Sequence, residues 1–355
     1  MRAIFKARKD PQPQLEQEPY NSDTRYSIEL PAFAKIQNSL HVYFENMSRL
    51  FPALDRENTL SRIHKALESL QYPSSGPKID IDYAAAPTIA LLCIILAIAE
   101  VNENNALSSN INSQASNFRD HARSLLQTFE LLPPSLEILR CHTLTTIYLL
   151  FMDFLDLAMQ SSAVTVQMAM ALQLHQQSPV PRKESDDHDR NLWWTIYILD
   201  RDIACLAGTP YLIRDEEIDA PRATRDDHFE RFSRAPYINC QSEFDEQATT
   251  LERSRDRDST YLEALAYLGR LWARIWNELI SNQLEPECQW QIAAVLDSQI
   301  NIFQQRLPST LVWRNTSSPG LDVENEIQRQ LLVLMVRRIL EFMLYHRFTD
   351  LETGG

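Results

Sequence analysis

The chain has 355 residues and very little glycine: six residues, with no glycine-rich loop among them. Loops that cradle phosphate groups need clustered glycines, because the backbone amides must approach the anion closely. P-loop and dinucleotide-binding classes are therefore excluded. The same scarcity of glycine, together with few alternating β-branched runs, predicts an all-α fold.

Closely spaced cysteines are also lacking. Five cysteines lie far apart in the sequence, at Cys93, Cys141, Cys205, Cys240 and Cys288. An odd number at such spacing, without a secretory leader, predicts reduced thiols in an intracellular compartment. Cysteine-rich zinc sites use ligand pairs that are near neighbours in sequence. We therefore expect no bound metal and no cofactor.

An excess of positive charge is also lacking. The net charge is −14 and the isoelectric point is near 5.1, so no global basic field draws the chain to nucleic acid or to an anionic membrane. A small basic cluster lies in the first nine residues and is a candidate for nuclear import or phosphate contact: Arg2, Lys6, Arg8 and Lys9. The favoured interpretation of this cluster is a solvated tail.

A 17-residue apolar run at 83–99 raises the question of a membrane span. It contains Pro87 near its start and lacks basic flanks, whereas a spanning helix needs ~20 apolar residues. We predict a central buried helix instead. Hydrophobic residues make up 44% of the chain, which suffices for one large core.

We predict a disordered tail at residues 1–27 and a single large multi-helix domain at 28–355. A polar loop or insertion is expected at about 222–258, where aliphatic residues are few. Asp55 and Ser135 are expected to cap helices. The other predicted loops lie at 71–82 and 102–113, and the other predicted helices at 40–54, 55–70, 114–131, 135–157, 158–175, 259–281, 285–307 and 323–348.

The stretch 189–207 combines strong apolar patterning with charge. It carries two adjacent stripes at helical spacing, one formed by Leu192, Ile196, Ile203 and Ala207, the other by Trp193, Tyr197 and Ala204. Asp200 and Arg201 lie within this helix and must have partners, because an unpaired buried charge costs several kcal/mol. Sequence neighbours do not face each other on a helix, so the two are expected to find different partners. For Arg201 we expect the turn at Gly208–Thr209–Pro210.

These residues also carry a resemblance to a known family. The pattern resembles the signature of the fungal-specific transcription factor domain, an all-helical region that follows the DNA-binding zinc cluster of fungal regulators. The matching positions are His175, Arg190, Trp193, Trp194, Tyr197, Asp200, Arg201, Gly208, Pro210, Asp219 and Pro221. The chain departs from the usual pattern at Thr209, where arginine is common, and at Ala220, where leucine is common.

The resemblance implies a transcription regulator that acts in the nucleus through other transcription proteins, a homodimer partner or a small-molecule effector. The family's zinc cluster needs six cysteines in a short segment, and these 355 residues contain no such group. Three explanations stay open: the module was lost, the sequence is truncated, or the protein acts without binding DNA directly. The alternative function is a stand-alone adaptor or small-molecule sensor with the same fold and no DNA binding of its own.

Enzymatic chemistry has little support. The acidic clusters 186–189 and 226–230 resemble those that hold magnesium and diphosphate in helical enzymes. Such clusters must face an apolar cavity, whereas both of these lie in charged segments that are expected at the surface. His175 and His188 lack a third ligand, and structural roles are favoured for both. Aromatic residues at helical spacing, including Trp272 and Trp276, favour a core over a ligand pocket. We predict no catalytic residue.

Overall fold

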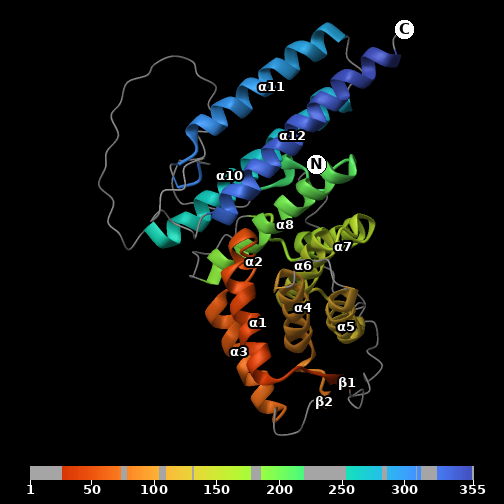
Figure 1. Ribbon diagram of the computed structural model, residues 1–355, viewed down its shortest axis with the longest axis vertical. Coiled ribbons are helices and arrows are strands. Elements are labelled where there is room, and N and C mark those ends of the chain that lie inside the picture. Colours follow the sequence, from red (N-terminus) through yellow and green to blue (C-terminus); the bar gives the residue numbers. More distant parts are fainter. Residues whose placement is uncertain are drawn as a thin grey trace, which may run out of the picture.

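The computed structural model describes residues 26–72, 78–103, 109–129, 132–176, 185–219, 253–281, 286–308, 310–312 and 326–353. These ranges are mostly helical, which confirms the predicted all-α class (Figure 1). None of the helices in them combines the length and apolarity needed to cross a membrane.

A short two-stranded antiparallel sheet pairs the start of the described chain with a later segment. Strand β1 (Tyr26–Glu29) pairs with β2 (Lys78–Ile81) so that Tyr26 lies opposite Ile81 and Glu29 opposite Lys78. The predicted loop at 71–82 is therefore wrong for residues 78–81, and the predicted tail at 1–27 is wrong for residues 26 and 27, which belong to β1. Residues 1–25 lie outside the described ranges. Four-residue strands are too short to produce a distinct periodic pattern, although Ile79 and Ile81 alternate toward the core.

Three helices lie between these two strands in the sequence. They are α1 (Phe33–Glu45), α2 (Met47–Leu50) and α3 (Arg56–Ser69). The predicted cap is confirmed, because the Asp55 carboxylate accepts hydrogen bonds from the amides of Glu57 and Asn58 at the start of α3. One carboxylate thus satisfies two backbone donors that the helix itself leaves unpaired.

Helix α4 (Ala86–Glu103) is the predicted buried apolar helix, and every residue from Pro87 to Glu100 is buried. It packs against α1, α5 (Ser109–Leu126) and α6 (Leu136–Phe151). Its buried Glu100 forms an ion pair with Lys35 of α1. The predicted loop at 102–113 is wrong at both ends, since α4 continues to Glu103 and α5 begins at Ser109.

A tight turn separates α6 from α7 (Leu155–Ala171), so α6 ends at Phe151 rather than at the predicted residue 157. The turn places Asp153 at a left-handed φ of 58°, and the amide of Phe154 donates to the carbonyl oxygen of Leu149. The predicted cap of α6 by Ser135 is confirmed. A short 3-10 turn, η2 (Gln127–Phe129), precedes this helix pair.

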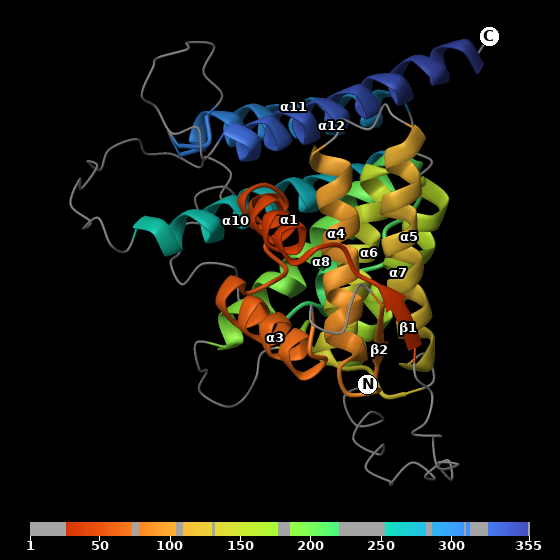
Figure 2. The same ribbon diagram turned by 60° about the horizontal axis from the view of Figure 1, so that its bottom comes forward.

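The remaining elements are α8 (Ser185–Ala207), a 3-10 turn η3 (Asp215–Glu217), α10 (Arg253–Ile275), a π-helical turn η4 (Trp276–Ile280), α11 (Pro286–Arg306) and α12 (Glu326–Thr353). Of the predicted insertion, residues 222–252 lie outside the described ranges, and 253–258 are helical. Helices α10, α11 and α12 run alongside one another at one end of the body (Figures 1 and 2). Helix α8 lies between two groups of helices. It packs against α6 and α7 on one side and against α10 and α12 on the other.

Candidate functional site

Helix α8 is buried on nearly its whole circumference from Leu192 to Ala204. Its aromatic residues Trp193, Trp194 and Tyr197 lie in the core together with Trp272 of α10, which confirms the core interpretation for these four. Trp276 packs against this core and is only partly buried. The charged pair lies among these side chains, with Asp200 3% and Arg201 1% exposed.

Asp200 holds the chain that follows α8. Its carboxylate accepts hydrogen bonds from the amide of Leu212 (3.0 Å) and the amide of Ile213 (3.0 Å), and also from Arg201 at 2.7 Å. The expectation that Asp200 and Arg201 have different partners is therefore wrong. The arginine side chain is long enough to bend back to its neighbour, and the buried carboxylate needs the positive charge because it is cut off from water.

Arg201 binds the same segment from its other side. One terminal nitrogen donates to the carbonyl oxygen of Ile213 (2.6 Å) and to the Asp215 carboxylate (3.1 Å). The guanidinium lies between two aromatic rings, 4.5 Å from the Tyr197 centroid and 3.8 Å from the Tyr211 centroid. Charge, hydrogen bonds and both ring faces together fix its position.

Two tyrosine hydroxyls complete this arrangement. Tyr197 donates to Asp215 at 2.8 Å, and the Tyr211 hydroxyl accepts from the Asn277 side chain of η4 at 2.8 Å. The segment 211–215 is thus held both to α8 and to η4, the turn that follows α10. We call this group the Arg201 latch: Tyr197, Asp200, Arg201, Tyr211, Ile213, Asp215 and Asn277.

The turn before the latch explains the family-like Gly208 and Pro210. Gly208 has a φ of +61°, a left-handed conformation that costs glycine little, and the Thr209 amide donates to the carbonyl oxygen of Ala204. Pro210 follows, where helix can no longer continue. The predicted contact between Arg201 and this turn is wrong. The partners of Arg201 lie just after the turn and begin at Tyr211.

The other signature residues spread around α8. The Asp219 amide donates to the carbonyl oxygen of His175 at 2.8 Å, and the His175 ring lies 6.0 Å from that of Trp193. Partial burial lowers the pKa of His175, against the opposing charge of Glu217. Arg190 is partly buried at the amino-terminal part of α8. Pro221 lies outside the described residues.

The first acidic cluster has structural partners. Asp189 forms an ion pair with Arg140 of α6 at 3.1 Å, and His188 lies 3.5 Å from the capping residue Asp55. The predicted second cluster, 226–230, lies outside the described residues. Where the structure describes the chain, no group of three potential ligands is arranged to hold a metal ion.

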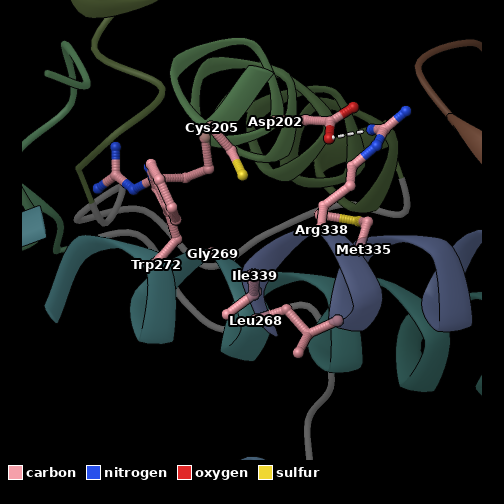
Figure 3. Close-up of a pocket in the computed structure, with 9 residues that line it drawn as sticks. Asp202, Cys205, Leu268, Gly269, Trp272, Met335, Arg338 and Ile339 are labelled. Atoms are coloured by element: carbon pink, nitrogen blue, oxygen red, sulfur yellow. Dashed lines mark hydrogen bonds and ion pairs between the residues drawn. The ribbon is translucent and has the colours of Figure 1, made fainter. Parts of the chain in front are cut away.

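A small cavity lies between α8, α10 and α12. Figure 3 shows the Asp202–Arg338 ion pair (2.7 Å) on one side of it and Trp272 on the other. Its volume of about 10 Å³ is at the lower limit for one water molecule and far below that of a metabolite pocket. Burial raises the pKa of Asp202, while Arg338 opposes that rise.

Gly269 and several latch residues were not anticipated from the sequence. A Cβ atom on Gly269 would lie 3.0 Å from Cε1 of Tyr197 and 3.1 Å from Cγ of Arg201, so this glycine permits the close approach of α10 to α8. A glycine within an apolar helical pattern was an available signal. Tyr211 and Asp215 gave no signal, because they lie in a short loop whose path depends on the latch itself.

Comparison with known proteins finds similarity to fungal transcriptional regulators. The family model of the fungal specific transcription factor domain matches residues 40–323. Transcription factor asqA of Emericella nidulans is 32% identical over 91 residues, which is 25% of this chain and 16% of that protein. An uncharacterized transcriptional regulatory protein of Schizosaccharomyces pombe is 27% identical over 199 residues, 54% of this chain and 24% of that protein. The match spans less than a quarter of either relative, and no solved structure matches the chain.

Proposed function

Because the chain belongs to the fungal specific transcription factor domain family, we propose that it is the regulatory region of a transcription regulator that works in the nucleus by contact with other proteins. The family match carries this proposal, since it covers residues 40–323, most of the chain. The relatives' names, a transcription factor and a transcriptional regulatory protein, support the same role.

The chemistry of the latch supports a structural basis for this role. Its charged groups are used by one another and by the backbone of residues 212–213, so they give α8 a fixed connection to the following segment rather than a reactive centre. Contacts of α8 with α6 and α7, and with α10 and α12, then hold these two groups of helices in one arrangement. Such an arrangement suits regulation through contacts at its surface.

A promoter-recruitment assay tests the proposal. The 355-residue chain is fused to an unrelated DNA-binding domain and expressed in a fungal host with a matching reporter gene. We expect reporter transcription to rise or fall relative to the DNA-binding domain alone. Arg201→Ala should remove the effect because it breaks the latch, whereas Arg337→Ala, at a solvent-exposed position of α12, should leave it intact. A nuclear, well-expressed fusion without any effect on the reporter would contradict the proposal.

A further inference from the structure

The Arg201 latch has the geometry of a binding site for a guanidinium ion. The planar end of Arg201 lies between two rings, 4.5 Å from the centroid of Tyr197 and 3.8 Å from that of Tyr211. Its two terminal nitrogens donate to two carboxylates and one backbone carbonyl oxygen. The Nε atom is buried and has no hydrogen-bond partner in the part of the chain that the structure describes. The surrounding groups therefore recognise the end of this side chain rather than its link to α8.

The walls of this site have supports of their own. Two backbone amides of the following segment donate to Asp200, each at 3.0 Å. The Tyr197 hydroxyl donates to Asp215 at 2.8 Å, and the Asn277 side chain donates to the Tyr211 hydroxyl at 2.8 Å. These hydrogen bonds do not involve the guanidinium group. The acceptors and rings are thus already placed for a planar cation, which lowers the cost of binding one.

Charge and shape together define the ligand. Two carboxylates, Asp200 and Asp215, face the single positive charge of Arg201. Burial raises the pKa of Asp200, and the charge of Arg201 opposes that rise. Without a cation the buried carboxylate would be uncompensated, which is strongly unfavourable. An ammonium ion carries the charge but cannot stack on both rings or donate through a planar fork, whereas guanidinium does both.

A small ion can reach this site once the Arg201 side chain is shortened. Tyr211 and Asp215 are partly exposed, so the site borders solvent on the side of the latch segment. Arg201 and Gly269 also line the small cavity between α8, α10 and α12. Arg201→Ala would therefore extend that cavity toward the rings and leave room for an ion of the size of the removed group.

We propose that the latch is a guanidinium-binding site, that Arg201 is its built-in ligand, and that segment 211–215 closes over whichever guanidinium fills it. The exposed side chains of this segment, Leu212 and Arg214, are then held in place by that ligand. The surface that the segment presents thus depends on one cation. The inference assumes no role in transcription, so it stands or fails separately from the reporter result.

Chemical rescue of Arg201→Ala in the full 355-residue chain tests the site. Guanidinium chloride is added up to about 50 mM, with sodium chloride at the same ionic strength as the reference. For so small a ligand we expect a dissociation constant on the order of 1 mM and a saturable rise of about 3 °C in melting temperature. The wild-type melting temperature should fall slightly, because its site is occupied and guanidinium is a denaturant. If the variant is unfolded alone, the expected result is a gain of helical circular dichroism when the ion is added.

Further measurements define the ligand and the site. Ammonium chloride at the same concentration should not rescue Arg201→Ala. Arg338→Ala removes an arginine that pairs with one carboxylate, Asp202, and guanidinium should not raise the melting temperature of this variant. In the double variant Arg201→Ala, Tyr211→Leu one ring is missing, so the rise should be lost.

Hydrogen exchange tests the closure of the segment directly. The amides of Leu212 and Ile213, which donate to Asp200, should exchange faster in Arg201→Ala than in the wild type and regain protection with guanidinium. No rise in melting temperature with guanidinium would overturn the proposal. So would an equal rise with ammonium or in Arg338→Ala, a rise that persists without the Tyr211 ring, or rescue that leaves the two amides unprotected.

Discussion

At the scale of single residues, Arg201 joins three parts of the fold, because its guanidinium contacts Asp200 of the same helix, the backbone of the following segment and two aromatic rings. Arg201→Ala leaves Asp200 buried without its positive partner. We expect a loss of about 3–5 kcal/mol in the free energy of unfolding, measured by urea denaturation. Arg201→Lys should also be destabilised, because an ammonium group cannot reproduce the planar fork between the rings.

Arg337→Ala is the control for this prediction. Arg337 pairs with Glu341 one turn away on the exposed side of α12, and such a pair contributes less than about 0.5 kcal/mol. If both arginine substitutions changed the free energy of unfolding equally, the latch would not have the structural role assigned to it.

Gly269 sets the distance between α8 and α10. In Gly269→Ala the new methyl group would press on Tyr197 and Arg201, the two latch residues nearest to it. We expect a loss of about 1–3 kcal/mol, although alanine normally favours a helix, and a lower melting temperature by calorimetry. An increase in melting temperature would show that the helices separate without cost.

The cysteines differ in their surroundings. Burial raises the pKa of each of the thiols of Cys93, Cys141 and Cys205 to about 12, whereas Cys288 is exposed on α11. Only the thiolate reacts with alkylating agents, so the buried thiols of Cys93 and Cys141 and the partly buried thiol of Cys205 stay protonated and unreactive between pH 7 and 9. We expect iodoacetamide to label Cys288 and to spare the other three in the native protein, as measured by peptide mass spectrometry. Labelling of Cys205 at the rate of Cys288 would contradict the packing around the cavity.

At the scale of elements, the cap of α3 allows a direct comparison of two contributions of one side chain. Asp55→Ala removes the acceptor of two amide hydrogen bonds and also the contact with His188, whereas His188→Ala removes only that contact. We expect a loss of about 1 kcal/mol in the free energy of unfolding for the first substitution and a smaller loss for the second. Equal losses would mean that the amide hydrogen bonds contribute nothing.

Local signals account for the elements that could be predicted from the sequence. The caps Asp55 and Ser135 and the apolar α4 have patterns that neighbouring residues determine. The β1–β2 sheet has none, because each strand is four residues long and its partner is some fifty residues away. The π-helical turn at Trp276–Ile280 was also missed, because side chains from other elements, such as Tyr211, hold its residues.

At the scale of the whole molecule, contacts between distant segments join the two ends of the described chain. The Gln328 side chain of α12 donates to the carbonyl oxygen of Arg49 in α2, and Arg338 pairs with Asp202 of α8. Sequence periodicity assigns each of these residues to a helix but cannot pair helices more than a hundred residues apart. The same limit applies to the latch, whose charged pair was predicted to be buried but whose partners in 212–215 were not identified.

These contacts predict a single cooperative unfolding transition. In urea, tryptophan fluorescence reports the core around Trp193 and Trp272, and circular dichroism reports all helices together. We expect the two signals to give the same midpoint. Two separated transitions would mean that α10–α12 unfold independently of the helices before α8.

The burial of α4 has a consequence for the order in which the protein is made. Its apolar surface is covered largely by α5 and α6, which are synthesised after it, while only α1 and α3 precede it. Until α6 leaves the ribosome, the growing chain carries about five helical turns of nearly continuous apolar surface. Such exposed segments aggregate or bind chaperones. The helix that forms the centre of the finished domain is thus its most vulnerable segment during translation.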